Sequence, residues 1–123
     1  MAVSQYKSKK SVSGKKYVAF RKTRLGDLGG ISTLTHIGKV RLKLKRVKGA
    51  NLKKSLLSDE FVNVAKDETT SKLKILSVVG NPANVNYTRR NIITKGAIVK
   101  TEKGDVKITS RPGQSGTLFG KFL

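Results

Sequence analysis

The sequence lacks cysteine and long apolar runs, and each absence excludes a class of protein. With no cysteine, the chain can form neither a disulfide framework nor a thiolate nucleophile nor a Cys-ligated metal site. Apolar runs extend for only a few residues, as at Ala97 to Val99, whereas a helix needs about 20 to span a bilayer. No apolar segment follows the basic stretch MAVSQYKSKK before Lys15 and Lys16. We therefore expect neither a signal peptide nor a membrane span, and predict a cytoplasmic protein.

Acidic side chains are also scarce. Seven Asp and Glu residues stand against 27 Lys and Arg residues, which gives a formal net charge of +20 over 123 residues. A chain with this imbalance repels itself unless an anion neutralises it. The length predicts one domain with at most an arm or tail. An anionic partner is expected, and a large two-domain enzyme is not.

The amino-terminal part of the sequence reads as a basic arm. Between Met1 and Leu25 there are eight basic residues and no acidic ones, without a clear period of 2 or 3.6. Such a segment buries too little apolar surface to offset its loss of conformational entropy, so we expect disorder until a partner binds. Gly26 to Gly38 follows as a glycine-rich loop. The predicted division is residues 1–37 as arm and loop and residues 38–123 as the folded domain.

Within the segment KVRLKLKRV, Lys39 to Val47, Val40, Leu42 and Leu44 alternate with Arg41, Lys43 and Lys45. A period of two predicts a β-strand with one cationic face. Same-face cations on a strand stand about 6.6 Å apart, a spacing that can follow a phosphate backbone. The alternative is an ordinary solvated face. Sixteen basic residues against one acidic residue between Met1 and Ser58 favour binding.

Turn chemistry separates several further apolar segments, which predicts a mainly β protein. Asn81 is suited to cap a short helical turn with Pro82 in its first position, and Glu102 to Gly104 to form a three-residue hairpin loop. About six short strands with little helix predict a small closed or nearly closed β-barrel carrying an extended basic arm. The other expected strands are Phe61 to Ala65, Lys72 to Val79, Gly96 to Thr101, Asp105 to Ser110 and Thr117 to Leu123.

Candidate catalytic groups are few. The single histidine, His36, lies in a glycine-rich loop and reads as a surface or phosphate-contacting side chain. Neither Gly26 to Gly30 nor Arg111 to Gly116 matches the phosphate-binding loop of nucleotide hydrolases. We expect no enzyme, no metal, no cofactor and no small-molecule substrate. The acids Asp59, Glu60, Asp67 and Glu68 are expected to counterbalance neighbouring lysines rather than to act as paired carboxylates.

Aromatic residues make up only 6% of the chain, so base stacking is a limited resource. Tyr17 and Phe20, within the arm, are available to stack on RNA or to wedge into it. Phe61, Phe119 and Phe122 are expected in the core. Recognition is therefore expected to depend mainly on phosphates and on RNA shape.

Several motifs together resemble one protein family. The longest are NPANVNYTRRNIITKGAIVK (Asn81 to Lys100) and TSRPGQSG (Thr109 to Gly116), and shorter matches are SGKKY, LTHIGKVR and RVKGANLK. The sequence resembles small-subunit ribosomal protein eight of the archaeal and eukaryotic type over nearly its whole length, in a short form that looks archaeal. Ala50 stands where the family usually has a second glycine, and His36 where arginine is common.

The resemblance implies a structural constituent of the small ribosomal subunit, with small-subunit rRNA and neighbouring ribosomal proteins as partners. Matching positions carry over the following rRNA contacts: Arg46, Lys48, Asn51, Lys53, Arg89, Arg90, Lys95 and Arg111. Charge and position add a second set: Lys7, Lys9, Lys10, Lys15, Lys16, Arg21, Lys22, Arg24, His36, Arg41, Lys43 and Lys54. Two alternatives stay open at this point, a ribosome-assembly factor that shares the barrel and a basic protein that coats nucleic acid.

Overall fold

The computed structural model describes residues 4–66 and 69–123. Asp67 and Glu68, two of the acids expected to offset lysines, lie outside the described residues. The chain divides into two compact units, Met1–Ser32 and Thr33–Leu123. No helix in the described part of the chain is both long and apolar enough to cross a membrane.

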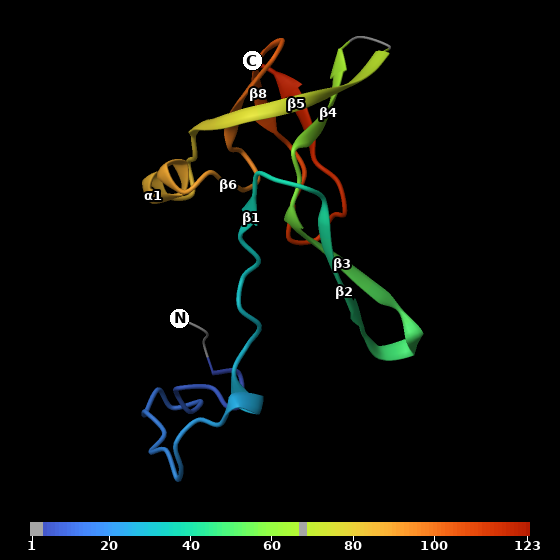
Figure 1. The fold of residues 1–123 in the computed structure, drawn as a ribbon. Coiled ribbons are helices and arrows are strands. Elements are labelled where there is room, and N and C mark those ends of the chain that lie inside the picture. The colour runs from blue at the N-terminus through green and yellow to red at the C-terminus, as the bar shows by residue number, and fades with distance from the viewer. Residues whose placement is uncertain (1–3, 67–68) are drawn as a thin grey trace. The chain divides into compact units, whose positions relative to one another are not determined.

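A closed five-stranded barrel forms the centre of the second unit (Figure 1). Its strands follow the order β4 (Phe61–Lys66), β5 (Thr69–Gly80), β7 (Ile98–Thr101), β8 (Gly104–Ile108) and β9 (Phe119–Phe122). Neighbouring strands are antiparallel except β4 and β9, whose parallel pairing closes the barrel. The predicted fold class, mainly β with a closed barrel, is confirmed, with five barrel strands where about six were expected.

The barrel interior is built from alternate residues of these strands. Val62 and Val64 of β4 are fully buried, as are Val99 of β7 and Val106 of β8. This inward and outward alternation is the period-two pattern of strands that face a core on one side. The complete buried cluster comprises Leu56, Val62, Val64, Leu73, Ile75, Val78, Ile93, Ala97, Val99, Val106, Ile108 and Leu118.

A second sheet lies beside the barrel in the order β2, β3, β1, β6. It contains β1 (Thr35–His36), β2 (Arg41–Arg46), β3 (Leu52–Ser58) and β6 (Ile92–Ile93). In Figure 1, β2 and β3 form an antiparallel ribbon that extends away from the barrel strands. All six residues of β2 are exposed, so the alternation at Lys39 to Val47 identified a strand but not a strand of the barrel.

Sequence reasoning missed β3 altogether. Its sequence, LKKSLLS, does not alternate, and only Leu56 is buried. Period-two alternation arises where one face of a strand is buried. In a ribbon that is exposed on both faces over most of its length, burial does not require apolar and polar residues to alternate.

The expected helical turn is present as α1 (Val85–Arg89), but the predicted cap is wrong. The N-cap is Asn84, whose side-chain oxygen accepts a hydrogen bond from the backbone N–H two residues later, at 2.9 Å. Asn84 therefore satisfies one of the free N–H groups of the first turn. Pro82 precedes the helix instead of occupying its first position.

Asn81 has a different role, because it is buried and fully engaged. Its Nδ2 donates to the backbone oxygen of Ile92 at 3.1 Å, and its Oδ1 accepts from Thr94 Oγ1 at 2.9 Å and from the N–H of Ala83 at 3.0 Å. A buried amide is stable only when its donors and acceptors are paired. Asn81 thus joins the end of β5 to the segment around β6.

Two smaller expectations are also corrected. Thr101 and Gly104 form a cross-strand pair, so the β7–β8 hairpin has a two-residue loop rather than three residues. Gly104 adopts a positive φ of 131°. Phe119 is 48% exposed and does not belong to the core, whereas Phe122 packs against the core.

The first unit has local order but no core. Isolated bridges join Ser4 to Leu28 and Lys10 to Lys16, and a short 3-10 turn, η1, spans Leu25–Asp27. None of the described residues from Ser4 to Ser32 is buried. Hydrophobic burial therefore does little to hold this unit together. Its disorder in the absence of a partner stays a prediction.

Candidate nucleic-acid interface

The register of the β2–β3 ribbon places three lysines on one face. Lys45 lies directly opposite Lys53, and Lys43 lies opposite Ser55. Because residues two apart on a strand point the same way, and paired residues share a face, Lys43, Lys45 and Lys53 project together. We call these three residues the cationic face. The other face carries Leu42, Leu44 and Leu52 together with two predicted contacts, Arg46 and Lys54.

Like charges directly opposite each other destabilise a strand pair. Within residues 4–66 and 69–123, the only ion pair within 4.0 Å joins Arg21 and Asp27. No described carboxylate therefore offsets the Lys45–Lys53 pair. An external polyanion would remove this repulsion.

One acid of the β3–β4 turn, Asp59, does not serve as the expected counter-charge. Asp59 is buried, and its Oδ1 accepts a hydrogen bond from the N–H of Phe61 at 3.0 Å. Its backbone also bonds to that of His36 and Gly38. Asp59 fixes a turn, which corrects the interpretation of this carboxylate as a partner for lysine.

The tip of the ribbon is a tight turn with two left-handed residues. Gly49 has φ of 72° and Ala50 has φ of 60°. The N–H of Val47 donates to the oxygen of Asn51 at 2.8 Å, and Asn51 Nδ2 donates to the oxygen of Lys48 at 3.3 Å. The Asn51 amide, a predicted rRNA contact, thus helps to close the turn. Lys48 is exposed in this turn, at the outer end of the ribbon.

A hollow at the base of the ribbon brings together His36, Lys39 and Arg41. It measures about 510 Å³, and Gly38 and Ser58 also line it. His36 and Arg41 are both predicted contacts, and Lys39 adds a further exposed cation. The structure therefore places the His36 imidazole beside two cations that follow Gly38 in the sequence.

The predicted contacts of the second unit that lie outside the ribbon and the hollow are exposed. Arg89 is the last residue of α1 and Arg90 its C-cap, and Figure 1 shows α1 next to β6. Lys95 follows β6. The backbone oxygen of Arg111 accepts bonds from the N–H groups of the residues three and four positions later, at 3.0 and 2.9 Å. That turn holds the Arg111 side chain at the surface.

Residues next to this arginine pair have a structural role. Asn91 Oδ1 accepts a hydrogen bond from the N–H of Val78 at 3.2 Å. Ile92 and Ile93 are buried. These three residues help to hold the domain together, while Arg89 and Arg90 are exposed.

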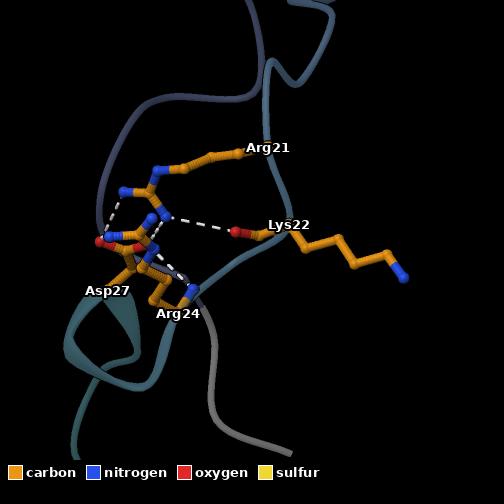
Figure 2. Close-up of polar contacts among 4 residues, drawn as sticks. All are labelled: Arg21, Lys22, Arg24 and Asp27. Carbon is orange, nitrogen blue, oxygen red and sulfur yellow. Dashed lines mark hydrogen bonds and ion pairs between the residues drawn. The ribbon is translucent and has the colours of Figure 1, made fainter.

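The arm cations are exposed with one exception. Arg21 is half-buried and forms a bidentate ion pair with Asp27 (Figure 2). Its Nη1 lies 2.5 Å from Oδ2 and its Nη2 lies 3.3 Å from Oδ1. The hydrogen bond from Arg21, followed by that from the Arg24 backbone, lowers the pKa of Asp27 below its usual value. The bond to Asp27 raises the pKa of Arg21. The exposed members are Lys7, Lys9, Lys10, Lys15, Lys16, Lys22 and Arg24.

Three lysines outside the predicted set occupy comparable positions. Lys45 belongs to the cationic face, and strand alternation alone could have added it. Lys107 of β8 lies directly opposite Lys121 of β9 on the barrel surface. Only the strand register brings this second like-charged pair together, since the two residues are far apart in the sequence.

Comparison with known proteins identifies the family of this chain. Residues 4–123 match the sequence model of the family Ribosomal protein S8e. The chain belongs to this family. It is 46% identical to small ribosomal subunit protein eS8 of Methanobrevibacter smithii over 100% of both chains.

Two further relatives with the same name agree along almost the full length. The protein of Methanococcus aeolicus is 45% identical, with 94% of this chain and 93% of that chain covered. The protein of Nanoarchaeum equitans is 45% identical, with 97% and 95% covered. The family resemblance drawn from the motifs is confirmed.

Proposed function

We propose that this protein is a structural constituent of the small ribosomal subunit in the cytoplasm, where it binds and stabilises folded small-subunit rRNA without catalysis. The observation that supports this most directly is the cationic face, because Lys45 opposes Lys53 with no described carboxylate to neutralise either. Such a face is unfavourable in the free protein and favourable against phosphates. Relatives named for the small subunit support the same function.

The proposed contacts combine phosphate neutralisation with recognition of RNA shape. Lysine and arginine bound to phosphates position a protein on RNA without reading its sequence. Neighbouring small-subunit proteins are the other expected partners. Contacts are assigned to the arm cations, the hollow that contains His36, the ribbon residues Arg41, Lys43, Arg46, Lys48, Asn51, Lys53 and Lys54, and the loop residues Arg89, Arg90, Lys95 and Arg111.

Sedimentation of a cell lysate tests this function. Roughly one copy per small subunit, retained after a high-salt wash and present in translating ribosomes, is the expected result. Presence only in precursor particles would instead identify an assembly factor. Migration with DNA, or in the free fraction, would indicate a coating protein and would contradict the proposal.

A further inference from the structure

The first unit contains a pocket in which aromatic rings and cations are interleaved. Tyr6, Tyr17 and Phe20 line it, and five lysines of the arm line it with them. Its volume is about 490 Å³, within the range of about 300 to 1,000 Å³ that is usual for small-ligand sites. The lysines are Lys7, Lys9, Lys10, Lys16 and Lys22.

The rings are held in place by cations but are not buried. Arg21 lies over the Tyr6 ring at 4.8 Å and over the Phe20 ring at 5.4 Å, and Lys7 lies over the Tyr17 ring at 4.1 Å. The centroids of Tyr6 and Phe20 are 6.2 Å apart. Tyr6 is nevertheless 57% exposed and Phe20 74%. Three accessible ring faces in a unit without a core are not explained by packing within the protein.

Asp27 fixes this arrangement through Arg21. It is the only acid in the chain before Asp59, and its two carboxylate oxygens hold the guanidinium that lies against Tyr6 and Phe20. A planar guanidinium can stack on a ring while its edge donates to a carboxylate. Arg21 is therefore a positioning residue for the rings, whereas the lysines around it remain available to a phosphate.

We propose that this pocket receives an unpaired nucleobase of the bound rRNA, which stacks against the rings of Tyr6 and Phe20 while lysines hold the adjacent phosphates. Every base has a flat π-face, and proteins that bind single-stranded nucleic acid combine aromatic platforms with a basic groove. Charge complementarity selects this occupant, since five lysines surround the rings. The inference rests on the proposed function, because it assumes that rRNA is the ligand.

Affinity for rRNA at several salt concentrations tests the pocket. We would measure filter binding of the full chain to transcribed small-subunit rRNA of the source organism. Tyr6→Leu and Phe20→Leu should each weaken binding about fivefold or more, the effect of one lost stacked base. The slope of log affinity against log salt should not change, because no phosphate contact is removed. Tyr6→Phe keeps a ring and should recover most of the affinity that Tyr6→Leu loses.

A matched control separates stacking from a general effect of removing a ring. Phe119 is an exposed aromatic on β9, outside the pocket, so Phe119→Leu should leave the affinity unchanged. The arm variants should fold, because neither Tyr6 nor Phe20 belongs to the buried cluster. Equal losses for Phe119→Leu and Phe20→Leu would overturn the proposal.

Photo-cross-linking to rRNA that contains 4-thiouridine gives a second readout. Adducts on the peptide that carries Tyr6, or on the one that carries Tyr17 and Phe20, are expected. If wild type binds rRNA but both leucine variants bind equally well, or the adducts avoid these peptides, the pocket proposal fails and the proposed function stands. If wild type does not bind rRNA at all, the proposed function itself fails.

Discussion

Replacing the cationic face by glutamine should change binding and stability in opposite directions. The variant Lys43→Gln, Lys45→Gln, Lys53→Gln removes three charges but keeps long polar side chains on the ribbon. The Lys45–Lys53 pair is directly cross-strand, and its repulsion costs a strand pair about 0.2 to 1 kcal/mol. The free protein should therefore be equally stable or slightly more stable, by a few tenths of a kcal/mol.

Binding to rRNA should weaken strongly. Each lost phosphate contact lowers the slope of log affinity against log salt by about 0.7 to 0.9. Three contacts therefore lower it by about 2.1 to 2.7. Measured against a 1 M reference, that change corresponds to a loss of about 100-fold to 500-fold in affinity at 0.1 M salt. Filter binding over a salt series measures the slope, and urea unfolding measures the stability.

A control with the same loss of charge distinguishes contact from the general field of the protein. Lys74, Lys100 and Lys103 are exposed barrel residues outside the predicted set, and their triple glutamine variant should keep nearly the wild-type slope. The reasoning is refuted if both triple variants change the slope equally, or if the ribbon variant unfolds at lower urea while it binds rRNA normally. The second result would mean that the three lysines serve the fold.

Three further predictions concern single residues. Gly120→Ala should destabilise the protein by about 2 to 3 kcal/mol in urea unfolding, because the added Cβ would lie 2.4 Å from Val106 Cγ1. As a control, the Cβ of Gly26→Ala meets nothing within 4 Å, and this variant should stay within about 0.5 kcal/mol of wild type. Ala50→Gly should stabilise by about 0.5 to 1 kcal/mol in the same assay, since relief of the left-handed conformation outweighs the greater chain entropy of glycine; a loss of stability would contradict this. In the folded state the pKa of Asp27 is lowered. The stability contributed by its pairing with Arg21 is therefore fully present above the usual pKa of aspartate and is lost as pH falls through the lowered pKa. NMR titration of this carboxylate should show a midpoint below that of a free aspartate.

The barrel could be predicted because its strands obey the physics that sequence patterns record. Val62 and Val64, or Val106 and Ile108, alternate with exposed residues because one face of each strand is buried. The same reasoning explains where prediction failed. Exposure of both faces leaves a strand free to alternate or not: β2 alternates, whereas β3, with the sequence LKKSLLS, does not, and the ribbon partner of β2 was not found.

The cap of α1 failed for a related reason. Asn81 and Asn84 have the same intrinsic ability to cap, and local sequence does not distinguish them. Tertiary contacts decide, because Asn81 is already engaged with Ile92 and Thr94 in the buried interior. For the candidate interface, sequence identified which residues are cations. It did not reveal that Lys45 opposes Lys53, since pairing between strands is set by register.

The distribution of charge against burial shows how one small chain combines a stable fold with a large excess of positive charge. The buried cluster contains no lysine or arginine, so the cost of desolvating a charge does not fall on the barrel. Some cations lie on the outer surface of the barrel, but most lie on β2 and β3, on α1 and the loops, and on a unit in which no described residue is buried. Those parts gain little from their own packing, and their repulsion is relieved only by an anion. Binding to RNA should therefore order and stabilise the ribbon and the arm far more than the barrel, and hydrogen exchange in the presence and absence of rRNA should show protection gained chiefly at residues 4–32 and 41–58. Equal gains across β4 to β9 would mean instead that the barrel itself depends on RNA to fold.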